Sequence, residues 1–221
     1  MSCINKFNNE AVALVMNNRH PRAIQKFHEA LVQMRGVMRA FPKDLSAPSY
    51  VASRPKTAPR HHVVILPSQA DHQSKREDMF LYLNPILLDE PTNLHPSTLA
   101  LYCAVTLFNV AILYHIEGVA KGRMRFLDKA QQMYQASLHF LNGQGLWNDT
   151  VFLLSLAAHN NLAHIELEKG TVEASNGHLG HAFELLQSIK ERALDILSDS
   201  ELHGFLLNSS LQGRISSAAA A

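Results

Sequence analysis

A short phrase that recurs three times along the chain constrains its fold more than any other feature. Each copy places an asparagine two residues before an alanine, as in N-N-E-A and N-N-L-A. Recurrence of this kind is typical of a chain built from repeated helical units, each of which buries its apolar face against the next. The three copies contain the pairs Asn9/Ala11, Asn109/Ala111 and Asn161/Ala163.

A second phrase follows the first two copies and has its own spacing. It consists of a small residue, an aromatic residue four positions later and another small residue three positions after that. On a helix this spacing puts all three side chains on one stripe, where the small residues allow a second helix to approach closely. We therefore predict helix–helix contacts at these positions. They are Ala23, Phe27 and Ala30 in the first copy, and Ala130, Tyr134 and Ser137 in the second.

This pattern resembles the tetratricopeptide repeat, a helix–turn–helix unit with the same order of small, aromatic and small residues. The stretch F-L-Y-L-N-P-I-L, together with the later H-N-N-L-A-H-I, is also similar to a group of repeat proteins from diatoms. The second likeness implies no activity. The first implies an all-α fold, a short tetratricopeptide-like superhelix of three antiparallel helix pairs that carries a non-helical insertion.

The chain divides into four parts by pattern. Residues 1–42 contain the first helix–turn–helix repeat, and residues 43–95 contain a linker followed by an extended or hairpin insertion. Residues 96–208 contain the second and third helix pairs and a short capping helix that ends near residue 207. Residues 209–221 are of low complexity, which predicts a disordered tail.

The insertion has two kinds of sequence. Residues 43–60 carry prolines among small and basic residues, and cannot bury enough apolar surface to offset the entropy of ordering. Two short apolar runs follow, Val63–Leu66 and Phe80–Leu88, with a polar stretch between them. They predict a small hairpin or an extended arm laid along the helices.

Two places depart from the repeat pattern. Residues 119–128 stand where a short turn is expected, and we interpret them as an insertion between the helices of the second pair. In the third pair the small–aromatic–small places fall on Ala174, His178 and His181, which is a degenerate version of the phrase.

The composition gives weaker constraints. The formal net charge is +1, and the only cysteines are Cys3 and Cys103, which do not form a disulfide framework. The first residues contain no secretory apolar core, and no uninterrupted apolar run approaches the roughly 20 residues of a membrane helix. The sequence therefore predicts a cytoplasmic protein, with the nucleus as an alternative, and no membrane partner.

The candidate binding residues are Asn9, Asn109 and Asn161. The tetratricopeptide resemblance implies that the first helix of each pair lines a concave groove. Asparagine there offers an amide donor and acceptor to the main chain of an extended peptide. We predict a protein-interaction scaffold, with no catalytic residue, metal or cofactor. We also expect these amides to be exposed, so that alanine at both Asn109 and Asn161 leaves stability nearly unchanged.

Two other functions stay open. Nine Lys and Arg residues lie between Arg19 and Arg60 against only two acidic residues, so a nucleic-acid-associated module that uses residues 19–62 is one rival. A metal-dependent enzyme is the other, because His178, His181 and Glu184 recur at a spacing of three on one helix. Salt-dependent RNA binding and metal analysis, respectively, would distinguish them.

Overall fold

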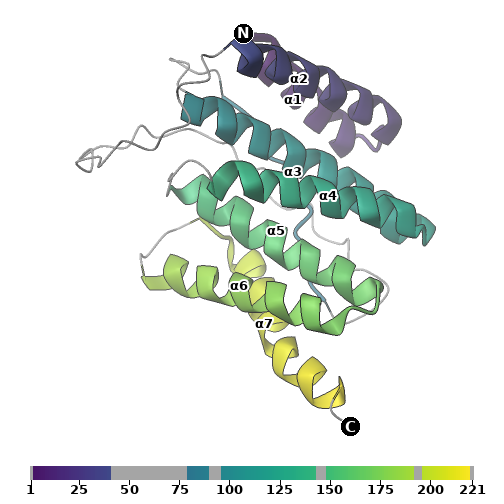
Figure 1. Ribbon diagram of the computed structural model, residues 1–221, viewed down its shortest axis with the longest axis vertical. Helices are drawn as coiled ribbons and strands as arrows, with labels where there is room; N and C mark the ends of the chain where they lie inside the picture. The colour runs from purple at the N-terminus through teal and green to yellow at the C-terminus, as the bar shows by residue number, and fades with distance from the viewer. Residues whose placement is uncertain (1, 41–78, 90–95, 143–147, 192–195, 220–221) are drawn as a thin grey trace.

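The computed structural model describes residues 2–40, 79–89, 96–142, 148–191 and 196–219. Every regular element in these ranges is a helix, which confirms the all-α class (Figure 1). The helices are α1 (Ser2–Met16), α2 (His20–Ala40), α3 (Pro96–Lys121), α4 (Met124–Asn142), α5 (Asp149–Glu168), α6 (Val172–Glu191) and α7 (Asp199–Ala219).

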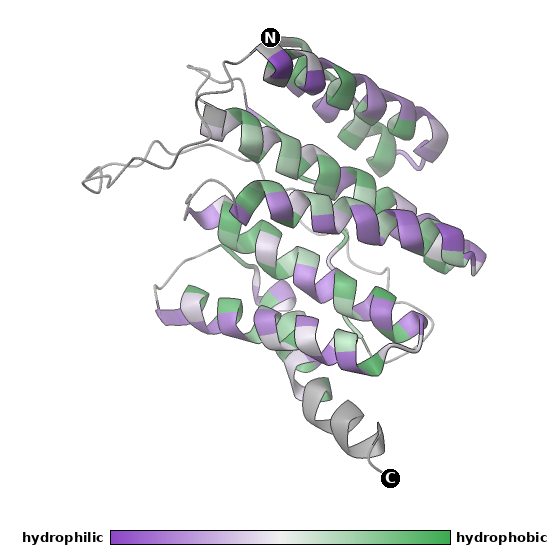
Figure 2. Ribbon diagram, viewed as in Figure 1, coloured by the Kyte–Doolittle hydropathy of each residue, from purple (hydrophilic) through white to green (hydrophobic). Residues whose placement is uncertain are grey.

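The helices form antiparallel pairs that stack in chain order. The pairs are α1 with α2, α3 with α4, and α5 with α6, while α7 packs against α6 (Figure 1). Successive pairs also touch, through α2 with α3 and α4 with α5. The even-numbered helices carry more polar residues on their outer faces, and the apolar residues gather on α3 and α5 inside the stack (Figure 2).

The three turns within pairs share one geometry. The first helix of each pair is followed within two residues by a residue with a positive φ, which is Asn18 at 54°, Gly122 at 58° and Gly170 at 78°. The next amide then bonds back to the carbonyl five residues before it, as in Arg123 N to Gly118 O at 3.0 Å. This is the Schellman arrangement, which satisfies the last carbonyls of a helix and reverses the chain in a few residues.

The same arrangement corrects one expectation. Residues 119–128 are not an insertion, because α3 continues to Lys121 and α4 begins at Met124. Gly122 alone supplies the left-handed conformation that the turn requires, so no longer connection is needed. Of the basic residues that made this stretch look irregular, Lys121 ends α3, Arg123 lies in the turn and Arg125 lies in the first turn of α4.

The small–aromatic–small stripes lie where they were predicted in α2 and α4. All six side chains are fully buried, and the stripe in α4 faces α3, since Ser137 Oγ donates to Ala104 O at 2.8 Å. The predicted contacts at these positions are confirmed. The members are Ala23, Phe27, Ala30, Ala130, Tyr134 and Ser137.

In α6 the stripe lies one residue later than the sequence indicated. Ala174 and His181 are exposed and His178 is only half-buried, so the register placed on them was wrong. The buried residues keep the spacing of four and three but use leucine in place of the aromatic residue, which hid the pattern. They are Ser175, Leu179 and Ala182.

Overpacking Ala130 should measure how closely α3 and α4 approach. Ala130→Leu is expected to lower the free energy of unfolding by about 1–3 kcal/mol, because the added carbon atoms of leucine cannot fit a filled core. Gln132→Leu, on the exposed side of the same helix, should change it by less than about 0.5 kcal/mol. Urea unfolding of both variants checks this, and an unchanged midpoint for Ala130→Leu would contradict the assigned contact.

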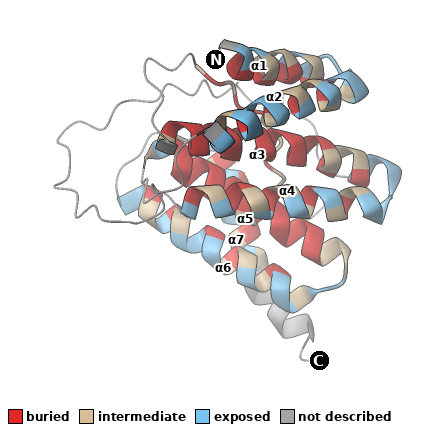
Figure 3. Ribbon diagram, turned by 45° about the horizontal axis from the view of Figure 1, so that its top comes forward, coloured by how far each residue is buried: buried red, intermediate tan, exposed pale blue. Residues whose placement is uncertain are grey.

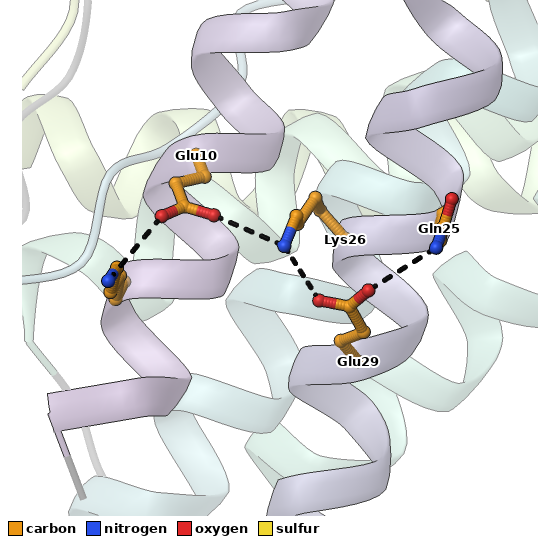
Figure 4. Close-up of polar contacts among 5 residues, drawn as sticks. Glu10, Gln25, Lys26 and Glu29 are labelled. Carbon is orange, nitrogen blue, oxygen red and sulfur yellow. Dashed lines mark hydrogen bonds and ion pairs between the residues drawn. The ribbon is translucent and has the colours of Figure 1, made fainter.

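On the outer surface α1 and α2 are joined by a small charge network. Lys26 Nζ lies 3.4 Å from Glu10 on α1 and 2.9 Å from Glu29 on α2, and Gln25 also bonds Glu29 (Figure 4). These carboxylates raise the pKa of Lys26. Such solvent-screened pairs contribute little to stability, so the pairing of α1 and α2 depends mainly on their buried faces.

The helix α3 is the most apolar helix among the described residues. Its residues 97–121 would be long and apolar enough to cross a membrane by length and composition alone, which the sequence reading did not anticipate. Within the fold, 89% of its most apolar window is buried (Figure 3). The central helix of a helical stack has this character, since helices pack on it from both sides.

Two other expectations differ from the structure or lie outside it. The helix α7 continues to Ala219, beyond both the capping helix expected to end near residue 207 and the predicted start of a disordered tail. The expected linker at 43–60 and the apolar run Val63–Leu66 lie outside the described residues, and the hairpin stays a prediction.

Candidate functional site

Residues 79–89, which we call the bound segment, lie outside any helix and cross the stack in the reverse of chain order. Phe80 at one end bonds α7, and Leu88 at the other end bonds α1. The narrow blue stretch in Figure 1 passes between these two ends. The asparagine side chains that bond its main chain form the asparagine surface, and all come from the odd-numbered helices. They are Asn5, Asn8, Asn9, Asn109, Asn160, Asn161 and Asn208.

Two asparagines grip the middle of the bound segment by its main chain. Asn109 accepts from Ile86 N at 2.8 Å and donates to Ile86 O at 2.7 Å. Asn161 accepts from Tyr82 N at 3.0 Å and donates to Tyr82 O at 2.7 Å. Each side-chain amide thus pairs with both main-chain groups of one residue, as the backbone of a neighbouring strand would.

The same contact recurs at both ends of the bound segment. Asn9 pairs with Leu88 N and O at 2.9 and 2.8 Å, and Asn208 pairs with Phe80 N and O at 2.8 and 2.7 Å. Within each half of the segment the gripped residues are two apart. This spacing suits an extended chain, in which main-chain groups of alternate residues face the same side.

Further side chains fix the orientation of the gripping amides. Asn8 Oδ1 accepts from Asn109 Nδ2 at 3.1 Å, and Asn160 Oδ1 accepts from Asn208 Nδ2 at 2.6 Å. Asn161 Nδ2 also donates to the hydroxyl of Tyr134 at 2.9 Å. Burial raises the pKa of that hydroxyl, which keeps it neutral. Because each amide has partners at both of its atoms, the polar surface is satisfied although it is buried.

Apolar side chains fill the space around these hydrogen bonds. Tyr82, Ile86 and Leu88 are each no more than 2% exposed. The ring of Phe205 on α7 lies 5.1 Å from that of Phe80 and 6.0 Å from that of Tyr82. The segment is therefore held by main-chain hydrogen bonds in an environment that excludes water, where such bonds are strongest.

The structure bears on the position and the exposure of the three predicted asparagines, whereas their binding of a partner peptide stays a prediction. Asn9, Asn109 and Asn161 do lie on one surface formed by the first helix of each pair, and they do contact main chain. Their exposure was wrongly predicted, because Asn109 and Asn161 are fully buried beneath the chain's own residues 79–89. The expectation that alanine at both positions leaves stability unchanged is corrected accordingly.

Sequence reasoning missed Asn208, which grips the segment from α7. A signal was present, since Asn208 stands two residues before the small residue Ser210, as the other asparagines stand before alanine. The doubled asparagines were a second signal. Asn8 and Asn160 each precede a gripping asparagine and each contribute a hydrogen bond to the segment's carbonyls.

Gly204 should be needed where the segment meets α7. A Cβ atom built there would lie 2.3 Å from the ring of Phe80, whereas one built at Gly177 on α6 meets nothing within 4 Å. Gly204→Ala is expected to lower the free energy of unfolding by about 1–2 kcal/mol by displacing Phe80. Gly177→Ala should instead raise it by up to about 1 kcal/mol, through helix propensity. Opposite shifts of the thermal midpoint are predicted, and a gain for both variants would contradict the close contact.

Histidines form two separate contacts away from the bound segment. His115 on α3 and His164 on α5 are buried with ring nitrogens 3.0 Å apart, and His159 lies 3.0 Å from His178. Burial, and then the neighbouring His164, hold the pKa of His115 well below its usual range. Burial, and then the neighbouring histidines, lower the pKa of His159 to about 4.

These histidines do not assemble the metal site that the spacing suggested. His181 contacts the ring of His159 at 5.1 Å between centroids and lies 3.6 Å from Glu184, and both His181 and Glu184 are exposed. Among the described residues, no group of three or more histidine, cysteine or acidic side chains is arranged to hold a metal ion.

Comparison with known proteins adds no assignment. No family model matches the chain, and no match was found among curated proteins or solved structures.

Proposed function

We propose that the chain is a protein-interaction module of the tetratricopeptide type, in which the three helix pairs and α7 form a short superhelical stack. Its asparagine surface is the floor of a concave groove that takes an extended apolar segment from a partner protein. In the free protein the bound segment fills this groove. The observation that carries the proposal is the pairing of Asn109 and Asn161 with both main-chain groups of a single residue.

Main-chain recognition supports a role in binding because it sets few demands on the sequence of the ligand. A side-chain amide reads any residue whose N–H and C=O point toward it, and apolar pockets at alternate positions then add selectivity. The pockets that receive Tyr82, Ile86 and Leu88 suit aromatic and aliphatic side chains. A partner segment of the form aromatic, aliphatic, aliphatic at the same spacing would therefore fit.

The chain's own segment makes binding competitive. Tethering raises its effective concentration to the order of millimolar, so a partner must displace it. Affinity measured on the intact chain is lowered by this competition, and a partner gains access when the segment is released. The proposal involves no catalytic step or cofactor and places the chain in the cytoplasm, with the nucleus as the alternative.

The experiment supplies the segment as a separate peptide. A fluorescent peptide of residues 78–90 is titrated into the intact chain and into a Tyr82→Ser, Ile86→Ser variant, whose own segment has lost its buried anchors. Binding to the variant should be roughly 100-fold tighter than to the intact chain, because the tethered competitor is weakened. Adding Asn109→Ala to the variant should abolish binding.

Circular dichroism at the same concentration verifies that the helices of the variant remain folded. A folded variant that fails to bind the peptide would contradict the proposal and would make residues 79–89 a permanent part of the core. If the double variant unfolds, the single Ile86→Ser variant is titrated in its place, with the same outcomes.

A further inference from the structure

One residue of α7 forms a hydrogen bond with a side chain of the bound segment, whereas the asparagine surface bonds its main chain. Glu201 lies in the first turn of α7 and is 6% exposed. Its Oε1 accepts a hydrogen bond from Asn84 Nδ2 at 2.8 Å. Asn84 stands between the two gripped halves of the segment, at the place where a spacing of two would put another main-chain contact.

The carboxylate of Glu201 is held in this orientation by α7 itself. Its Oε2 accepts from the amide of Ser198 at 2.9 Å and from the hydroxyl of Ser198 at 2.7 Å, and the hydroxyl accepts from Glu201 N at 3.3 Å. This is a capping box, in which the N-cap residue that precedes the helix and the third helical residue satisfy each other's backbone amides. One oxygen of Glu201 is thus committed to the helix end, and the other faces residue 84.

We propose that Glu201 determines specificity in the groove, by selecting partner segments with a hydrogen-bond donor at the position of Asn84. The inference rests on the proposed function. It specifies the ligand as an extended peptide with aromatic residues at the places of Phe80 and Tyr82, a donor side chain at the place of Asn84 and aliphatic residues at the places of Ile86 and Leu88.

The physical reason is the burial of the carboxylate. An oxygen shielded from water loses its hydration, and an amide donor replaces that hydration with a charge-assisted bond. A leucine at the same place would leave the oxygen without a donor. An aspartate would have nearly the shape of asparagine but would place a second negative charge against the first, which is more unfavourable still.

The test uses three peptides of residues 78–90, which are the native sequence, Asn84→Asp and Asn84→Leu. Each is titrated into the Tyr82→Ser, Ile86→Ser variant and into the same variant with Glu201→Gln. Glutamine keeps the capping box, and its amide group can donate to an aspartate. The native peptide should bind the first protein at least 30-fold more tightly than the Asn84→Asp peptide, and Glu201→Gln should reduce this ratio to below 5-fold.

The outcomes separate this inference from the proposed function. If no peptide binds a folded protein, both are overturned. If the native and Asn84→Asp peptides bind equally, the groove function stands and the role of Glu201 is overturned.

A measurement on the intact chain needs no added peptide. Asn84→Asp should speed amide hydrogen exchange at Tyr82 and Ile86 at least tenfold, and Glu201→Gln in the same chain should restore most of the protection. Unchanged exchange in the Asn84→Asp chain would overturn the inference independently of any binding result.

Discussion

Replacing both Asn109 and Asn161 with alanine is expected to lower the free energy of unfolding by about 3–9 kcal/mol. Asn161→Ala removes the partner of both Tyr82 N–H and Tyr82 C=O, whereas Asn109→Ala removes the partner of Ile86 N–H only, because Ile86 C=O keeps its hydrogen bond from Asn8. Each buried group left without a partner costs about 1–3 kcal/mol. The loss approaches the whole stability of an ordinary domain, which is about 5–15 kcal/mol. The single variants are therefore measured alongside the double variant, with about one third of the effect expected for Asn109→Ala and about two thirds for Asn161→Ala.

The control removes an exposed side-chain amide that lies outside the asparagine surface. Gln135 is exposed on α4, and Gln135→Ala should change the free energy of unfolding by less than about 0.5 kcal/mol. Urea unfolding followed by circular dichroism gives all four values. A loss below about 1 kcal/mol for the double variant would mean that water replaces the amides, so that the asparagine surface does not hold the segment.

Acidification should destabilise the fold above the pH range in which carboxylates titrate. The pKa values of His115 and His159 are lowered in the folded state, so between pH 6.5 and about 4 the unfolded chain binds more protons than the folded one. The contribution of these two histidines to the free energy of unfolding is therefore fully present above about pH 6.5 and is lost as the pH falls. Each unit by which a folded pKa is lowered corresponds to about 1.4 kcal/mol.

The decisive comparison is between histidine variants over pH 7.5 to 5. The wild-type chain should lose about 2 kcal/mol or more over this range, because the buried imidazole of His115 and the half-buried imidazole of His159 resist protonation. His159→Gln should flatten the dependence, whereas His139→Gln removes an exposed histidine outside both contacts and serves as the control. Equal slopes for wild type and His159→Gln would show that this histidine is not the source of the acid sensitivity.

The sequence predicted the helices well because their signals are local. Proline at the start of α3, glycine after α5, and the stripes in α2 and α4 each act within a few residues. The errors also have local causes. Leu179 is buried at the place where the repeat has an aromatic residue, so the stripe of α6 was assigned one residue too early. Basic residues near Gly122 were interpreted as part of an insertion.

The candidate site was only half predictable, for a different reason. The apolar run Phe80–Leu88 was expected to lie along the helices, and Asn9, Asn109 and Asn161 were expected to bind an extended main chain. Nothing local connects these two expectations, since these three asparagines are up to 79 positions from the residues that they bond. The contact between the apolar run and the asparagines is a tertiary contact. It buries the asparagines that were expected to be exposed.

Amide hydrogen exchange on the intact chain at neutral pH tests the central claim most directly. If asparagine side chains hold residues 79–89 by the main chain, the amides of Phe80, Tyr82, Ile86 and Leu88 exchange at least 100-fold more slowly than in the free peptide of residues 78–90. Asn161→Ala should then release Tyr82 most strongly. Exchange of all four amides at the rate of the free peptide would contradict the claim.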